Sequence, residues 1–349
     1  MSRPVAGPPP PPPPPPIAPL VGGRERPRIS VMLPTYEPDE RLLQALAAVL
    51  AQAPGPDAMQ ITVVDDGSRA GLVEDLVRTA DPRGRVEVVL HRGRLGLAGN
   101  WNRAIDLARG HLVHILHQDD CVLPGFYSRI TRGFAAASEI GMAFCRSRII
   151  DGAGRLLKVN SRLRWFPGVI DDWLATIAER QRVQTPAAVV ARSTYEAIGG
   201  YRPDLCQALD WEMWVRIAAQ YPVWYEPRPL AAYRRHETNE STRLATSGEL
   251  WPDITRAIEI NSWSLPDHAR QTLMAASCRW HASSALRSAE RLIASGATDQ
   301  AIAILAALPR MIGLADSGPP EPTMRRFAAL RERLGRGPAS GDVGLERCA

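Results

Sequence analysis

Two hydrophobic patterns alternate along the first third of the chain. Short apolar runs rich in β-branched residues predict buried strands, and apolar residues at three- and four-residue spacing between these runs predict helices. The predicted strands are Arg28–Tyr36 (broken at Pro34), Gln60–Val64, Val86–Leu90 and Leu112–Gln118. The predicted helices are Glu40–Gln52, Leu72–Ala80 and Asn100–Arg109. Strands and helices that alternate at this short spacing predict a mostly parallel, doubly wound α/β sheet.

The pattern becomes mainly helical toward the C-terminus. Gln184–Val190 is typical of one more strand, and helices are expected at Ser193–Ile198 and Ala208–Ala218. The spacing predicts further helices from Trp251 to Leu334. Breaks in this last region are expected at Leu265-Pro266, Ser295-Gly296 and Ser317–Pro320. We expect a helical appendage that packs on the sheet, with dimer formation or contact with a membrane surface as its alternative roles.

The two ends of the chain carry little hydrophobic pattern. Met1–Pro27 is low in complexity and contains nine consecutive prolines, which favour an extended polyproline helix. We expect residues 1–27 to form a disordered, solvated tail, with a ligand for a proline-binding partner as the alternative. The sheet domain then spans residues 28–243 and the helical region residues 244–335. A flexible tail is expected at residues 336–349.

Composition narrows the class of protein. A length of 349 residues suits one large domain with a satellite, or two domains, and an apolar share of 45% is that of a globular protein. The net charge is +5, and Lys158 is the single lysine, so arginine supplies nearly all the positive charge. Arginine suits the bidentate recognition of phosphate, but no dense basic block is present, so we expect no nucleic-acid partner. The five cysteines form no CxxC pair, which argues against a zinc site.

The hydrophobic pattern also bears on localisation. No run of about 18 apolar residues occurs, so no transmembrane helix is expected. We expect a cytoplasmic protein, with peripheral contact at the inner face of a membrane as the alternative.

Pairs of carboxylates follow two of the predicted strands. Asp65 and Asp66 come after the second strand, and Asp119 and Asp120 come after the fourth. Because parallel strands share one carboxyl edge, both pairs are expected on the edge where α/β sheets bind ligands. Adjacent carboxylates repel each other and need a cation, a helix N-terminus or solvent to stay ionised. The alternative for each pair is an ordinary turn or helix cap.

Four motifs in order resemble a known family. They are the segments Ile29–Tyr36, Val63–Ser68, Leu95–Asn102 and His117–Asp120. Together they resemble the family 2 glycosyltransferases, and the resemblance covers about residues 28 to 240. It implies the GT-A fold, in which a Rossmann-like sheet binds a nucleotide-diphosphate sugar, and inversion of the anomeric centre during transfer.

The resemblance also implies which residues bind the donor. These residues are Pro34, Thr35, Tyr36, Asp65, Asp66, Asn100, Asn102, His117 and Gln118. Either Asp65 or Asp66 would accept a hydrogen bond from the base, because an imide N–H needs an acceptor. The amides of Asn100 and Asn102 would touch ribose or sugar hydroxyls, with helix capping as the alternative for Asn100.

A metal site is implied at the fourth strand. The family motif is Asp-X-Asp, and His117 stands at its first position, so Asp119 would supply the main metal carboxylate. Asp120 would be a supporting partner or a helix cap, and His117 would contact the ribose or pack in the interior. The implied cofactor is Mg²⁺ or Mn²⁺, which keeps waters and substrate phosphates among its ligands.

A later segment resembles the acceptor half of the family. Asp210 matches the general base, although Leu209 replaces the glutamate that usually precedes it. Glu212 is the alternative base. Trp211 would stack on a sugar face, or pack in the core as one of the pair Trp211 and Trp214.

The last motif is a Tyr-Arg-X-His segment near residue 235. Arg234 and His236 would grip the diphosphate, and His236 would also complete the metal shell. A solvated basic turn is the alternative for these two residues.

The sequence as a whole therefore predicts an inverting hexosyltransferase in cell-surface polysaccharide synthesis. Its donor would be a UDP- or dTDP-sugar, and its acceptor the hydroxyl of a glycan or of a lipid-linked molecule. A catalytically impaired nucleotide-sugar-binding scaffold is the non-enzyme alternative. A sugar nucleotidyltransferase ranks lower, because Pro34–Pro38 offers no glycine-rich phosphate loop.

Overall fold

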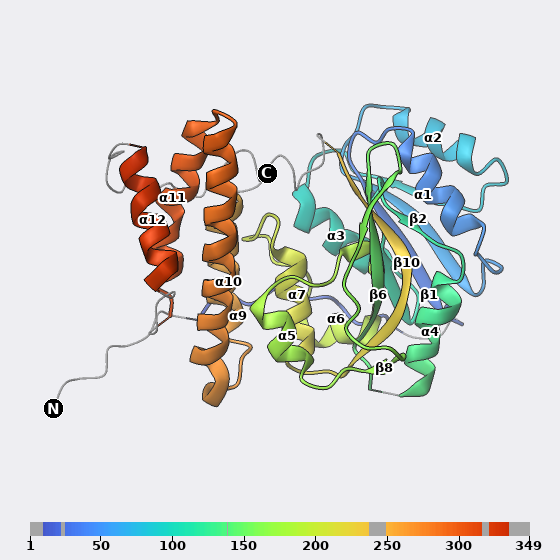
Figure 1. Ribbon diagram of the computed structural model, residues 1–349. Coiled ribbons are helices and arrows are strands. Elements are labelled where there is room, and N and C mark those ends of the chain that lie inside the picture. The colour runs from blue at the N-terminus through green and yellow to red at the C-terminus, as the bar shows by residue number, and fades with distance from the viewer. Residues whose placement is uncertain (1–9, 22–24, 138, 237–248, 316–320, 335–349) are drawn as a thin grey trace.

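The computed structural model of the protein describes residues 10–21, 25–137, 139–236, 249–315 and 321–334. Figure 1 shows a sheet with helices on both faces, and a group of helices coloured orange to red that stands beside it. The boundary predicted near residue 243 and the tail predicted at residues 336–349 lie outside the described residues.

A ten-stranded mixed sheet runs through the larger part of the molecule. Its order is β3-β2-β1-β4-β9-β6-β10-β5, with β7 paired to β6 and β8 paired to β10. The strands are β1 (Ile29–Thr35), β2 (Met59–Asp65), β3 (Glu87–Leu90), β4 (Leu112–Ile115), β5 (Cys121–Val122), β6 (Met142–Asp151), β7 (Leu156–Val159), β8 (Gly168–Val169), β9 (Ala188–Ala191) and β10 (Val223–Arg235). Strands β1 to β4, β6 and β10 share one direction, and the other four oppose them. The predicted mostly parallel sheet is confirmed.

Helices cover both faces of the sheet because side chains alternate along each strand. Val31 and Leu33 of β1 join one apolar core with the first helices, and Met32 between them joins the other core. The helices of the sheet domain are α1 (Arg41–Leu50), α2 (Leu72–Ala80), α3 (Gly96–Leu107), α4 (Phe126–Ala136), α5 (Trp173–Glu179), α6 (Arg192–Ile198) and α7 (Leu209–Ala218). Of these, α1, α2 and α4 cover the first face, and α3 and α7 cover the second.

The first strand continues through Pro34, where a break was predicted. Pro34 pairs in register with Val64 of β2, and β4 pairs with β1 only as far as Met32. Pro34 therefore lies beyond the end of the β1–β4 pairing, where its lack of an N–H costs no strand hydrogen bond to β4. Proline is accepted in a strand at such a position. The β6 to β8 ribbon and α5 are elements for which the sequence pattern gave no prediction.

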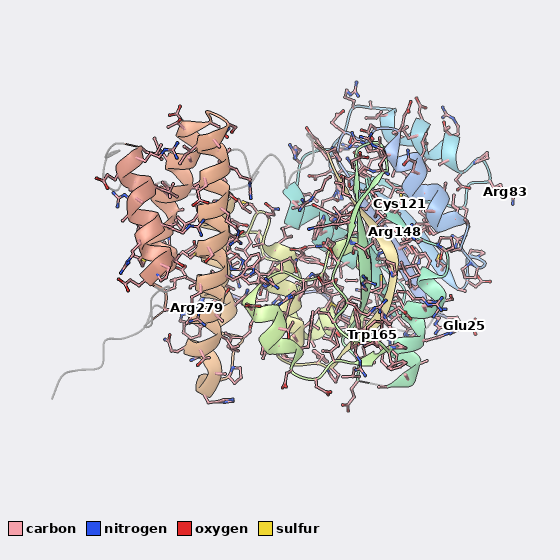
Figure 2. All side chains as sticks on the ribbon, in the orientation of Figure 1. Glu25, Arg83, Cys121, Arg148, Trp165 and Arg279 are labelled. Atoms are coloured by element: carbon pink, nitrogen blue, oxygen red, sulfur yellow. The ribbon has the colours of Figure 1, made fainter. Side chains whose placement is uncertain are left out.

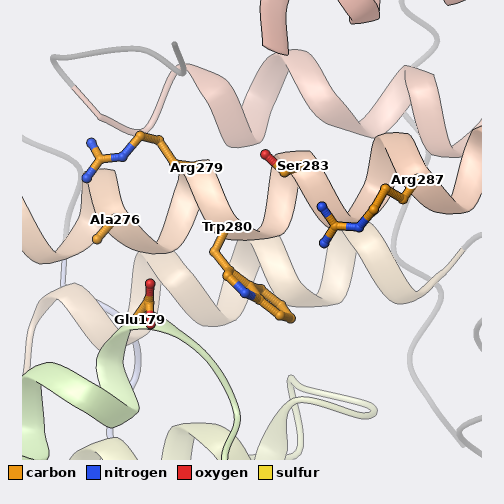
Figure 3. Close-up of a pocket in the computed structure, with 6 residues that line it drawn as sticks. All are labelled: Glu179, Ala276, Arg279, Trp280, Ser283 and Arg287. Carbon is orange, nitrogen blue, oxygen red and sulfur yellow. The ribbon is translucent and has the colours of Figure 1, made fainter. Parts of the chain in front are cut away.

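The C-terminal helices break at two of the predicted places, Leu265-Pro266 and Ser295-Gly296, and the third predicted break, Ser317–Pro320, lies outside the described residues. The helices are α9 (Leu250–Ser262), α10 (Asp267–Ala294), α11 (Thr298–Ile312) and α12 (Glu321–Arg333). Helix α9 packs on α7 and α10 packs on α5, so one apolar core continues from the sheet domain into the helical region. A hollow of about 310 Å³ between α5 and α10 is lined by residues that include Glu179, Arg279, Trp280 and Arg287 (Figure 3). Among the described residues, no helix is long and apolar enough to cross a membrane.

The proline-rich segment packs on the sheet domain between residues 10 and 20. Ile17 is only 3% exposed and joins the core on the α3 side of the sheet. Pro15 accepts a hydrogen bond from the Gly200 N–H (2.8 Å), and Pro12 accepts one from the Arg202 guanidinium (2.7 Å). This stretch therefore differs from the predicted solvated tail, because an extended backbone without internal hydrogen bonds leaves its carbonyls free to accept from neighbours.

The packing of this segment predicts a stability effect for Ile17→Ala. We expect the free energy of unfolding to fall by about 2 kcal/mol, since a buried isoleucine loses its apolar contacts. Chemical denaturation of the full chain measures the effect. Ala18→Ser is the matched control because Ala18 is exposed. Equal unfolding free energies for Ile17→Ala and the wild type would show that the segment does not pack in solution.

Candidate active site

The acidic turn after β4 is tied to the end of β10. The Asp120 side chain is buried, and its Oδ1 accepts a hydrogen bond from the Arg234 backbone N–H (2.8 Å). Asp119 lies beside it, with Oδ2 2.8 Å from Nε2 of His236. These contacts follow from the topology, because β5 directly follows the turn and pairs antiparallel with β10. The sheet therefore brings Asp119, Asp120 and His236 together from segments more than a hundred residues apart.

The Arg234 side chain holds this turn in place. Its guanidinium donates to the backbone oxygens of Asp119 (2.8 Å) and Gly152 (3.2 Å), and to Oε1 of Gln44 (2.8 Å). Arg234 is only 2% exposed. The prediction that its guanidinium grips a diphosphate is therefore corrected: it binds backbone carbonyls at the base of the site.

His117, Asp119 and Asp120 form a cluster that suits a divalent cation. One ligand atom from each lies within 4.8 Å of the others. Among the described residues, Asp120 Oδ2 and His117 Nε2 are buried without a hydrogen-bond partner, although His117 Nδ1 lies 3.2 Å from Asp120 Oδ2. Burial, together with the charge of Asp119, raises the pKa of Asp120 to about 6. A bound cation would be a partner for the buried atoms that lack a hydrogen bond, and its charge would stabilise the ionised carboxylate. The residues present therefore fit Mg²⁺ or Mn²⁺.

Asp210 lies in the first turn of α7. Its Oδ2 accepts a hydrogen bond from the Thr185 hydroxyl (3.1 Å), and its Oδ1 accepts one from the Trp211 N–H (2.6 Å). Burial raises the pKa of Asp210 to about 6. Burial alone would lower the pKa of His117, but hydrogen bonding to Asp120 and the charges of Asp119, Asp120 and Asp210 raise it above its usual value. Asp210 is thus close enough to His117 for their charges to interact.

Two sets of buried contacts fix the start of α7. The carboxylate of Asp253, on α9, accepts hydrogen bonds from the N–H groups of residues 206 to 208. Arg216 forms a bidentate pair with Glu212 (2.8 Å for both bonds) and donates to the Ile198 and Gly200 carbonyls. Because Glu212 is buried in this ion pair, the structure excludes it as the alternative base.

The ends of β1 and β2 form the other side of the candidate site. Asp65 uses both carboxylate oxygens within its own neighbourhood, accepting from Thr35 Oγ1, the Ser68 hydroxyl and the Gly67 and Ser68 N–H groups. Asp66 accepts one hydrogen bond at each oxygen, from the Leu95 and Gly96 N–H groups at the start of α3. A hollow of about 450 Å³ opens beyond these strand ends, lined by residues that include Asp65, Ser68 and His91.

Comparison with known proteins decides the family. Residues 30–184 match the model of glycosyl transferase family 2. An uncharacterized protein of Mycobacterium tuberculosis is 30% identical over 63% of this chain and 70% of its own length. This chain belongs to glycosyl transferase family 2. It is therefore a glycosyltransferase.

Two further relatives carry functional names. An uncharacterized glycosyltransferase of Methanocaldococcus jannaschii is 22% identical over 57% of this chain and 68% of its own length. The succinoglycan biosynthesis protein ExoO of Rhizobium meliloti is 31% identical over 40% of each chain.

Solved structures confirm the GT-A-like fold of this glycosyltransferase. S. aureus TarS in complex with UDP-GlcNAc superposes with a TM-score of 0.63 at 15% identity, over 88% of each chain. A mannosyltransferase from Pyrobaculum calidifontis in complex with GDP-Man and Mn²⁺ gives a TM-score of 0.52 at 19% identity, over 82% of this chain and 87% of that one. At these identities the likeness shows the fold alone.

Two asparagines predicted to touch the donor instead join elements of the glycosyltransferase. Asn100 is 4% exposed and donates to the carbonyls of Thr35 and Val64, which links the ends of β1 and β2. Asn102 exchanges two hydrogen bonds with the Tyr201 backbone (2.8 and 2.6 Å). Both therefore act on the framework of the site, and the predicted contact of Asn102 with sugar hydroxyls is corrected.

Trp211 is also a framework residue. Its ring is 2% exposed, donates from Nε1 to the Ile177 carbonyl (2.7 Å) and packs against His281 of α10. The predicted stacking of Trp211 on a sugar is therefore wrong, and the alternative of core packing holds. Trp214 is likewise buried and donates to the Val183 carbonyl.

The end of β1 keeps an accessible aromatic ring. Tyr36 is 39% exposed, and the Arg94 guanidinium lies 3.7 Å from the centre of its ring. Gln118 exchanges hydrogen bonds with the Tyr36 N–H (2.9 Å) and carbonyl (3.1 Å), so it links the β1 and β4 ends. Pro34 and Thr35 are buried behind this ring.

Sequence reasoning gave too little weight to Trp101 and Asp120. Trp101 is buried, and its ring packs at a tilt against His117, with 4.8 Å between the ring centres, and meets Tyr201 edge-on at the same distance. It therefore orients His117 toward the acidic turn. The orphan oxygen of Asp120 makes this residue a candidate ligand, beyond the supporting role predicted for it. The pair of adjacent aspartates in the sequence could have indicated the role of Asp120, but no motif or spacing indicates the role of Trp101.

Proposed function

We propose that the protein is an inverting glycosyltransferase that moves a sugar from a nucleotide-diphosphate donor to a hydroxyl group. The observation that carries the proposal is the half-buried Asp210, whose pKa is raised to about 6 by burial and whose charge acts on the His117–Asp120 cluster. A carboxylate with that pKa is ionised near neutral pH and is a better proton acceptor than an exposed aspartate. We therefore assign the base and the acidic turn to one site, and the charge interaction between Asp210 and His117 supports this assignment.

Asp210 acts as the general base in the proposed transfer. Its carboxylate takes the proton of the acceptor hydroxyl as that oxygen forms a bond to C1 of the donor sugar. The bond between C1 and the diphosphate oxygen breaks at the same time, and the nucleoside diphosphate leaves with the electron pair. Attack from the side opposite the leaving group inverts C1. The Thr185 hydroxyl and the Trp211 N–H each donate to one oxygen of this carboxylate and so hold it in position.

The acidic turn would hold Mg²⁺ or Mn²⁺ through Asp119, Asp120 and His117. When bound, the cation would neutralise charge on the diphosphate leaving group. His236 contacts Asp119 and so orients that carboxylate (Nε2 to Oδ2, 2.8 Å). The Mn²⁺ and GDP-Man in the Pyrobaculum mannosyltransferase, a protein of the same fold, support this assignment.

The donor nucleotide is proposed to bind across the ends of β1, β2 and β3. Asp66 is favoured over Asp65 as the acceptor for the base, because the oxygens of Asp65 already receive two hydrogen bonds each. The exposed face of Tyr36 and the hollow beside Asp65 offer space for a planar ring. UDP-sugars are the first donors to test, since S. aureus TarS binds UDP-GlcNAc.

The acceptor is proposed to be a glycan or a lipid-linked molecule of a cell-surface polysaccharide pathway. The name of the R. meliloti relative, a succinoglycan biosynthesis protein, supports this class. The same cleft could bind a donor without transfer if Asp210 were inactive, and the next experiment separates these two cases.

Asp210→Asn tests the base directly. We expect release of nucleoside diphosphate from UDP-, dTDP- or GDP-sugars to fall by about 10²–10⁴-fold, because an amide cannot accept the acceptor's proton. Thermal shift with the same donors checks that binding persists. Asp75→Asn, an exposed aspartate of α2, is the matched control. Unchanged turnover in Asp210→Asn contradicts the assigned role, and donor binding without turnover in the wild type favours a scaffold.

The raised pKa of Asp210 predicts a pH profile. Below about pH 6 its carboxyl group is protonated and cannot accept a proton, so the transfer rate should fall about tenfold per pH unit there and level off above. The dependence of kcat/KM on pH measures this limb. Asp210→Asn should lose the limb along with most of the rate. A wild-type profile that stays flat from pH 7 down to pH 5 would argue against a base with this pKa.

A further inference from the structure

An exposed apolar ribbon follows β6. Leu156 and Leu157, on β7, are 56% and 57% exposed, and Trp165 and Phe166, in the loop before β8, are 76% and 75% exposed. Successive residues of a strand that packs on a core alternate between buried and exposed, but here both leucines are exposed. Strand β7 pairs only with the last part of β6, at Arg148–Ile150, so among the described residues its outer edge pairs with no other strand. We call Leu156, Leu157, Trp165 and Phe166 the ribbon patch.

Positive charge surrounds the ribbon patch. The segment from Gly152 to Ile170 contains Arg155, Lys158, Arg162 and Arg164 and no carboxylate. All four cations are exposed, as is Arg148 on β6, and Figure 2 labels Arg148 and Trp165. The Arg162 guanidinium lies 4.1 Å from the centre of the Trp165 ring, which holds the indole among the cations. Among the described residues, no carboxylate pairs with Lys158, Arg162 or Arg164.

The ribbon borders the candidate active site at both ends of β7. Before β7, the Gly152 carbonyl accepts a hydrogen bond from Arg234, the residue that holds the acidic turn. After β7, the Asn160 amide donates to Gln184, whose neighbour Thr185 contacts Asp210. The ribbon patch is therefore fixed relative to both the acidic turn and the proposed base.

We propose that the ribbon patch docks on the headgroup layer of an anionic lipid bilayer. Tryptophan, with an apolar body and a polar N–H, is suited to that layer, and flanking arginine and lysine attract anionic headgroups. The apolar side chains project from a narrow hairpin and its loop, a shape that enters between headgroups and needs no concave partner. An acidic protein surface would match the charge but not the solvent-directed aromatic pair.

Docking of this kind would deepen the proposed function. It would present the cleft to hydroxyl groups anchored at the bilayer surface, which selects a lipid-linked acceptor over a free glycan. This last step rests on the proposed function, whereas the membrane contact itself does not.

Vesicle sedimentation of the full chain tests the contact without any assay of transfer. We expect the chain to sediment with vesicles of phosphatidylcholine and phosphatidylglycerol, and to remain in solution with phosphatidylcholine alone. Trp165→Ser/Phe166→Ser should lower the partition coefficient roughly tenfold or more, because the inserted apolar surface is lost. Trp263→Ser is the matched control, since Trp263 is exposed in the helical region at 47%.

A second variant separates charge from insertion. Lys158→Gln/Arg162→Gln/Arg164→Gln should remove the preference for the anionic vesicles, and added salt should weaken wild-type binding in the same direction. Equal partition of the wild type and Trp165→Ser/Phe166→Ser would overturn the proposal. The proposal would also be overturned if the wild type did not bind vesicles but self-associated, and Trp165→Ser/Phe166→Ser abolished that self-association. The ribbon patch would then be a protein interface. Loss of transfer by Asp210→Asn, with vesicle binding unchanged, keeps the two proposals distinguishable.

Discussion

The site depends on one tie, between the end of β10 and the turn that follows β4. The buried Asp120 accepts the Arg234 N–H, and the Arg234 guanidinium donates to the Asp119 carbonyl. Through this tie two adjacent carboxylates are kept at one sheet edge against their mutual repulsion. Asp120 Oδ2 remains without a hydrogen-bond partner, although His117 Nδ1 lies 3.2 Å from it. A buried carboxylate without a full set of partners is costly unless a ligand supplies them.

A second constraint acts on the proposed base. Helix α7 is held on one side by Arg216, which donates to the Ile198 and Gly200 carbonyls, and on the other by Asp253 of α9. The helical region therefore contributes to the geometry of the site through Asp253. The arginine-rich composition is explained in part here. Arg192, Arg202, Arg216 and Arg234 are buried and donate to backbone carbonyls, a use that a rigid fork of five donors allows.

Much of the fold could be predicted because its signals are local. The period of the apolar residues located β1 to β4, α1 and α2, and turn residues located the breaks before and after α10. The parallel direction of the strands then placed both acidic pairs at one edge of the sheet. Strands β7 and β8 escaped prediction because they have only four and two residues, and β7 is largely exposed, so neither carries a clear apolar pattern. The proline-rich segment was assigned to solvent on composition, and only the tertiary structure shows that Ile17 has a place in the core.

The candidate site could be predicted by residue type but not by the direction of each side chain. The side chains of Trp211, Asn102 and Arg234 are of types that bind a sugar or a phosphate. Each of them instead donates a hydrogen bond to a backbone carbonyl of the protein. A sequence motif predicts which side chains lie near the end of a strand. Which of them face the cleft depends on packing from α10, from the turn at residues 199–202 and from Gly152, none of which a local pattern contains.

Anomalous diffraction from crystals grown with Mn²⁺ and UDP tests the central claim most directly, that the acidic turn tied to β10 is the cation site. The account predicts a manganese peak within about 2–2.5 Å of carboxylate oxygens of Asp119 or Asp120, with the Arg234 contacts preserved. A peak at Asp65 and Asp66 instead, or UDP bound in the cleft with no manganese at the acidic turn, would contradict it.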